Sequence, residues 1–172
     1  MLSLALHQKA KFPVDPRTGL PVENPKERIK FLVDELSQKR ATIVVPSPAL
    51  SEFLVIVFPS GPEYVQTLNK SARFDVRPFD EMAAIEAAEM YRSFLDSGDK
   101  KGGAAGPVQK INVDRQIVAI TKVSGAERLY TSDRDVINIA NRWKVPVTAV
   151  WELPLPAEDQ PFLFGPAPDA GD

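Results

Sequence analysis

The segment NVDRQIVAITKVSGAERLYTSDRD (112–135) carries the acidic residues with the clearest chemical setting. Its pattern predicts a helix opened by Asp114, a turn at Ser124-Gly125 and a strand over 128–132 that ends at Asp133. In open α/β sheets, ligands bind outside the carboxyl ends of the strands. We therefore expect Asp133 at the mouth of a sheet and Asp114 on the helix that packs against this strand.

Glu52 is a third acidic candidate, because it lies in a helix predicted directly after a buried strand at 41–45. That position brings a side chain close to the end of a strand. Each acid also has a simpler structural role. Asp114 would cap a helix, Asp133 would begin the next helix, and Glu52 would be one of the many solvated glutamates on helix surfaces. The residues alone leave both interpretations open.

The composition restricts the remaining chemistry. The chain has no Cys and a single histidine, His7, so thiolate catalysis, cysteine-zinc sites and multi-histidine metal sites are excluded. The net charge of −2 gives no basic field for binding a bulk polyanion, although it is compatible with an enzyme that holds phosphate through a metal ion. Any chemistry must come from carboxylates, hydroxyls, Lys and Arg.

Predicted strands alternate with predicted helices along the chain. Strands are predicted at 41–45, 73–77, 128–132 and 146–150, with helices at 24–38, 49–57, 62–70, 81–96 and 134–141. This order predicts an α/β domain with three layers (α/β/α) and a mainly parallel sheet over residues 1–151. The proline-rich residues 152–172 are predicted to be a disordered tail. The N-terminal run LSLAL is too short for a membrane span, so we expect a cytoplasmic protein without a membrane partner.

Three blocks in this order resemble the PIN domain, the metal-dependent nuclease fold of VapC-type toxins. IVVPSPALSEFL (43–54) resembles the strand, proline turn and acidic helix of the family, with Glu52 as its acid. VDRQIVAIT (113–121) resembles the helix that bears an Asp, here Asp114. LYTSDRD (129–135) resembles the strand that is followed by Thr-x-Asp, here Asp133. The likeness covers roughly residues 1–150.

One feature of the family is missing. Its first strand ends in Asp-x-Asn and supplies the first carboxylate, whereas here LSLAL (2–6) resembles the segment that comes after that motif. Asp15 lies in a proline-rich loop and does not take over the role. The chain as written is therefore expected to lack the central strand of the sheet and one metal ligand. A start codon assigned too far downstream explains this absence more simply than a PIN-like domain that has lost its first strand. We expect a gap or irregular pairing beside the strand 41–45.

The resemblance implies a catalytic site of Glu52, Asp114 and Asp133 that holds Mg²⁺ or Mn²⁺, with Asp135 as an additional ligand. Thr131, Ser132 and Lys110 would contact the substrate. The implied activity is hydrolysis of single-stranded RNA by a toxin-type ribonuclease that has a protein antitoxin and forms a homodimer. The alternative is a PIN-like module with an incomplete site that only binds a partner.

Overall fold

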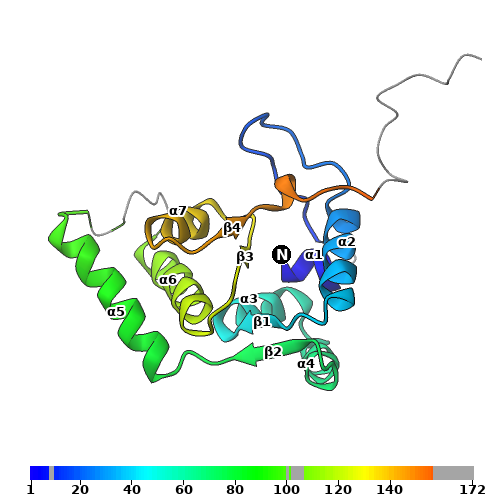
Figure 1. Ribbon diagram of the computed structural model, residues 1–172, viewed down its shortest axis with the longest axis horizontal. Helices are drawn as coiled ribbons and strands as arrows, with labels where there is room; N and C mark the ends of the chain where they lie inside the picture. The colour runs from blue at the N-terminus through cyan, green and yellow to red at the C-terminus, as the bar shows by residue number, and fades with distance from the viewer. Residues whose placement is uncertain (8–9, 100, 102–106, 157–172) are drawn as a thin grey trace, which may run out of the picture.

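The computed structural model describes residues 1–7, 10–99, 101 and 107–156, which form a mixed α/β structure (Figure 1). The helices are α1 (Leu2–Leu6), α2 (Pro25–Gln38), α3 (Ser47–Val57), α4 (Gly61–Lys70), α5 (Glu81–Asp96), α6 (Val108–Val123), α7 (Arg134–Arg142) and the 3-10 helix η1 (Val150–Glu152). The strands are β1 (Ile43–Pro46), β2 (Phe74–Arg77), β3 (Leu129–Tyr130) and β4 (Val147–Thr148). The predicted order of elements is therefore present, with shorter third and fourth strands.

The four strands form two separate parallel pairs in the described part of the chain. β1 pairs with β2, so that Ile43 lies opposite Phe74. β3 pairs with β4, so that Leu129 lies opposite Val147. The parallel pairing agrees with the expected α/β class, and the break between the pairs agrees with the gap expected beside 41–45.

Helix α2 and helix α5 begin in different ways. Pro25 occupies the first turn of α2, which suits a residue that has no amide hydrogen to leave unpaired. Asn24 precedes the helix, but its side chain makes no capping hydrogen bond and its backbone is left-handed (φ 46°). Asp80 does cap α5, because its carboxylate accepts a hydrogen bond from the Ala83 amide at 2.9 Å.

Helix α6 corrects the prediction that Asp114 opens a helix. The helix begins at Val108, and Asp114 is a buried residue in its interior. The apolar face explains the difference, since Ile111 and Val118 lie seven positions apart on one face and both are fully buried. The helix packs against α5 and α7 and also against α3 and β1 (Figure 1). It therefore connects the α5 and α7 helices to the β1–α3 segment.

Three apolar clusters hold the elements together. One lies around α6 and α7 and includes Val118 and Ile139. A second joins α3, α4 and β1 through Phe53. The third joins α1, α2 and η1 and includes Leu153, which is buried, so the ordered body extends beyond residue 151. Residues 157–172 of the predicted tail lie outside the described residues.

Candidate functional site

Asp133 is positioned by the turn between β3 and α7. It is the N-cap of α7, and its Oδ1 accepts hydrogen bonds from the backbone amides of Asp135 (2.9 Å) and Val136 (3.4 Å). The Thr131 hydroxyl accepts a hydrogen bond from the Asp133 amide at 3.2 Å and so fixes the turn. Asp133 therefore does begin the next helix, as its simpler structural role predicted. Its second carboxylate oxygen, Oδ2, takes no part in the cap and lies 2.9 Å from the Nζ atom of Lys110.

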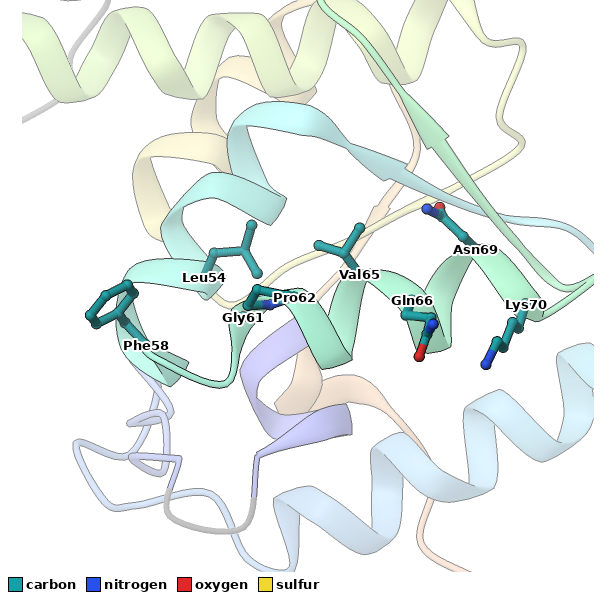
Figure 2. Close-up of a pocket in the computed structure, with 8 residues that line it drawn as sticks. All are labelled: Leu54, Phe58, Gly61, Pro62, Val65, Gln66, Asn69 and Lys70. Carbon is teal, nitrogen blue, oxygen red and sulfur yellow. The ribbon is translucent and has the colours of Figure 1, made fainter.

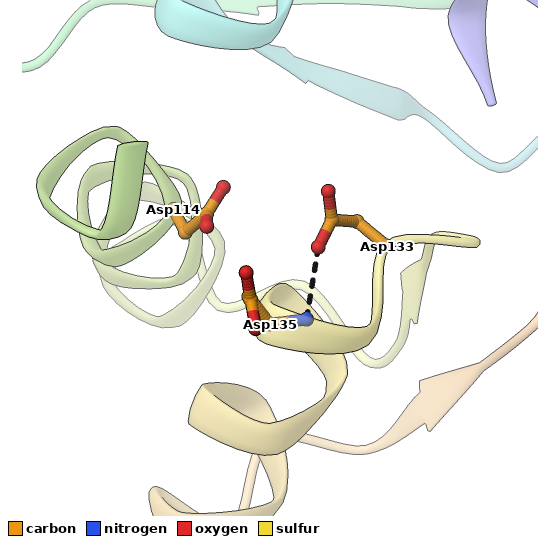
Figure 3. A group of neighbouring side chains, drawn as sticks. All are labelled: Asp114, Asp133 and Asp135. Atoms are coloured by element: carbon orange, nitrogen blue, oxygen red, sulfur yellow. Dashed lines mark hydrogen bonds between the residues drawn. The ribbon is translucent and has the colours of Figure 1, made fainter. Parts of the chain in front are cut away.

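Three aspartates converge at this turn. Asp114 projects from α6, while Asp133 and Asp135 project from the start of α7 (Figure 3). One carboxylate oxygen from each lies within 4.8 Å of the others. Asp114 is 3% exposed, and the other two are half-buried. The structure thus brings together three of the four predicted metal ligands.

Lys110 lies among these three carboxylates. Its Nζ atom lies 2.8 Å from Oδ2 of Asp114, 2.9 Å from Oδ2 of Asp133 and 3.3 Å from Oδ2 of Asp135. The ammonium can donate three hydrogen bonds, which matches three acceptors. Lys110, for which a substrate contact is predicted, neutralises part of the acidic cluster in this structure.

The electrostatics follow from this geometry. Burial disfavours the charged form of Lys110, but the hydrogen bonds and charges of Asp114 and Asp133 outweigh it and raise the pKa of Lys110. Burial also raises the pKa of Asp114, and the neighbouring charges of Asp133 and Asp135 act in the same direction, while Lys110 opposes them. The carboxylates therefore stabilise the charged form of Lys110, while burial and the neighbouring acids favour the neutral form of Asp114.

Glu52 lies outside the compact group of aspartates. It is exposed on α3, and it lines the same cavity as Asp114 and Asp133. The Met1 amino group is buried nearby, and desolvation lowers its pKa, while the charges of Asp133 and Glu52 oppose the shift. Glu52 therefore belongs to the surroundings of the site, and Asp135 takes the third place in the cluster.

The two predicted hydroxyl residues have different positions. Thr131 serves the turn through its hydrogen bond to the Asp133 amide. The Ser132 hydroxyl lies 3.9 Å from the Met1 sulfur, a weak contact. Both line the cavity next to the acids. They are therefore close to the site, with no direct contact to the three carboxylates among the hydrogen bonds of the described residues.

The bridging role of Lys110 was missed in the sequence, although a signal was present. Lys110 and Asp114 are four positions apart, and residues at this spacing meet on one face of a helix. Recognising it required the helix to begin before Lys110. Arg115 was also missed: it is 2% exposed, and its guanidinium lies 4.7 Å and 4.8 Å from the ring centroids of Tyr91 and Phe94.

The cavity beside the acids is larger than a second hollow on the described surface. It has a volume of about 870 Å³ and is lined by β1, β3 and the helices around them. A shallower groove of about 590 Å³ lies between α3 and α4 and includes Leu54, Phe58 and Val65 (Figure 2). No acidic side chain lines that groove, so it does not extend the candidate site.

No protein-family model matches this sequence, and no curated protein matches it. Among the described residues, no helix combines the length and apolar character needed to cross a membrane.

Proposed function

We propose that this chain is a PIN-like ribonuclease that hydrolyses single-stranded RNA with Mg²⁺ or Mn²⁺. One observation carries the proposal: Asp114, Asp133 and Asp135 place carboxylate oxygens within 4.8 Å of one another at the end of β3. They come from two of the three blocks that resemble the family. A three-layer PIN arrangement and the toxin-type role with a protein antitoxin belong to the same proposal.

The donor set suits a hard divalent cation. All three side chains offer carboxylate oxygens, which Mg²⁺ and Mn²⁺ prefer over nitrogen or sulfur ligands. The presence of the Lys110 ammonium between them shows that a positive charge is stabilised at this position. Asp114, Asp133 and Asp135 would hold the cation, and Lys110 would have to turn away or share the carboxylates.

The residues of the chain have distinct tasks in this proposal. When bound, the cation would polarise the scissile phosphate and lower the pKa of water for in-line attack. Thr131 keeps Asp133 oriented through the turn, and the amides of α7 hold one of its oxygens. Once displaced from the carboxylates, the Lys110 ammonium could pair with an RNA phosphate.

The proposal is tested by cleavage of a labelled single-stranded RNA with Mn²⁺ or Mg²⁺. Asp114→Asn and Asp133→Asn keep the side-chain shape and remove one charge each. We expect each change to lower the rate by roughly 10²-fold or more, because the cation and its positioning supply most of the rate. Asp75→Asn, which alters an acid that pairs with Arg77 on β2, is the matched control and should cleave normally.

Two results would contradict the nuclease proposal. One is equal cleavage by the wild type, Asp114→Asn and Asp133→Asn. The other is cleavage that continues at the same rate in EDTA. Both would show that the RNA is hydrolysed without these carboxylates or without a metal.

A non-enzymatic interaction module is the second candidate. The observation that favours it is Lys110, which contacts all three aspartates, together with Glu52, which lies outside the compact cluster. In this case the ion pairs serve to hold α6 against α7. A chain that never cleaves RNA in either cation, and whose cluster does not bind Mn²⁺, would support the module.

A further inference from the structure

Lys110 contacts carboxylate oxygens that a divalent cation would need. The cap of α7 uses Oδ1 of Asp133, which accepts from the amides of Asp135 and Val136 and leaves Oδ2 for another partner. Lys110 Nζ lies 2.9 Å from that Oδ2 and also donates to Oδ2 of Asp114 and of Asp135. A cation held by the three aspartates takes at least one oxygen from each. At Asp133, therefore, the ammonium and the cation compete for the same atom.

Lys110 is the member of this cluster that can move. Asp114 is buried in the interior of α6, and Asp133 is fixed by its cap on α7. Lys110 reaches the carboxylates from the first turn of α6 through a flexible four-carbon stem, and its side chain is partly exposed. A doubly charged cation that enters the cluster repels the ammonium. The lysine side chain therefore leaves, and the carboxylates stay in place.

The departure of Lys110 changes the charge that a phosphate would meet. With Lys110 in place, three ionised carboxylates and one ammonium leave a net negative cluster, which repels a phosphodiester. With a divalent cation bound and the ammonium beside it, the same groups are neutral overall. The ammonium then has its donors free for a phosphate oxygen, and the phosphate keeps it away from the carboxylates. Each ligand removes an obstacle to the other.

We propose that Lys110 is a built-in competitor of the divalent cation, and that its transfer from the carboxylates to a phosphate makes the cation and a phosphodiester bind cooperatively. This inference rests on the proposed function, because it concerns the same metal site. It adds a regulatory property, since a nuclease site needs both ligands without requiring that either one tighten the binding of the other. In the absence of the cation, Lys110 and the carboxylates keep the site in a state that repels RNA.

NMR of the full chain labelled with ¹⁵N-lysine follows Lys110 directly. The Nζ signal of Lys110 is identified by its absence in Lys110→Arg, which keeps the positive charge. Saturating Mg²⁺ should shift this signal, because the ammonium loses its three carboxylate partners. The Nζ signal of Lys39, which pairs with Glu35 on α2, should not change. The wild type supplies this readout, so the stability of an uncharged variant does not affect it.

Titration of Mn²⁺ into the wild type and Lys110→Met measures the coupling. Each titration is made with an excess of dimethyl phosphate, a small anionic phosphodiester, or of trimethyl phosphate, its neutral analogue, at equal ionic strength. We expect dimethyl phosphate to tighten Mn²⁺ binding about fivefold or more in the wild type and less than about twofold in Lys110→Met, which keeps only the direct contact between cation and phosphate. Trimethyl phosphate should have no effect on either protein. Lys110→Gln is a second uncharged variant and should behave like Lys110→Met.

The outcomes separate this inference from the proposed function. If a cation binds but the Lys110 signal does not change, the inference is overturned and the proposed function stands. The same holds if dimethyl phosphate tightens Mn²⁺ binding equally in the wild type and in the uncharged variants. If neither Mg²⁺ nor Mn²⁺ binds, both are overturned. A shifted Lys110 signal, together with coupling that is lost in the uncharged variants, supports the inference.

Discussion

Replacing Lys110 by methionine would keep much of the length of the side chain and remove the charge that joins the three aspartates. In the absence of a divalent cation, Asp114, Asp133 and Asp135 would repel each other without compensation. We expect the Lys110→Met protein to be less stable than the wild type in EDTA. We also expect it to bind Mn²⁺ more tightly, because no ammonium competes for the carboxylates.

The size of the loss follows from the exposure of the partners. Removing one member of a fully buried ion pair costs about 3–5 kcal/mol, whereas an exposed pair contributes about 0–1 kcal/mol. The Lys110 side chain is 37% exposed and that of Asp114 is 4% exposed, so solvent screens only part of the interaction. We therefore expect a decrease of about 2 kcal/mol in the free energy of unfolding. A cation at about 100 times its dissociation constant adds about 2.7 kcal/mol, which would restore the loss.

Urea unfolding in EDTA and in Mn²⁺, together with calorimetric titration of Mn²⁺, measures both effects. Lys39→Met is the matched control, because Lys39 pairs with Glu35 at the same four-residue spacing on an exposed helix face, at 3.6 Å. It should change stability by less than about 0.5 kcal/mol. If Lys110→Met is as stable as the wild type in EDTA and binds Mn²⁺ no more tightly, the ammonium does not hold the cluster together and the reasoning is wrong.

Three further predictions concern stability. Phe53→Ala should lower the free energy of unfolding by about 3–5 kcal/mol in urea titrations, because Phe53 is 1% exposed and meets Tyr64 edge to face. Asp133→Ala should be about 1 kcal/mol less stable than Asp133→Asn in EDTA, because asparagine still caps α7; equal stabilities would exclude the cap. The raised pKa of Asp114 means that the folded state binds its proton more tightly than the unfolded state, so stability should fall as the pH rises from about 4 through the folded pKa. Asp114→Asn should lack that part of the decrease in thermal melts across this range.

The sequence predicted the order of elements because local signals were strong there. The predicted helices 24–38 and 81–96 agree with α2 and α5 to within a residue. The mouth of the site was also predictable, since Asp133 directly follows the predicted strand 128–132. These signals are local and need no knowledge of tertiary contacts.

The remaining features depend on contacts between distant segments. The start of α6 was misplaced because Asp114 resembles an N-cap, whereas its burial depends on packing against α7 and α5. The exclusion of Glu52 from the cluster depends on where α3 lies relative to α7, which is a tertiary distance. The length of β3 also depends on its neighbouring strand. β4 pairs with only two residues of the predicted strand 128–132, Leu129 and Tyr130, so β3 is short.

Asp114 and Arg115 are neighbours of opposite charge with different partners, so their contacts depend on how α6 is oriented about its own axis. Successive residues point about 100° apart around a helix, so the acid faces α7 while the base lies against the rings of α5. One residue inserted between Lys110 and Asp114 would place the two side chains on different faces of the helix and so separate the ion pair. An insertion before Pro107 would leave it intact. Length variation should therefore be tolerated ahead of this helix and selected against within it.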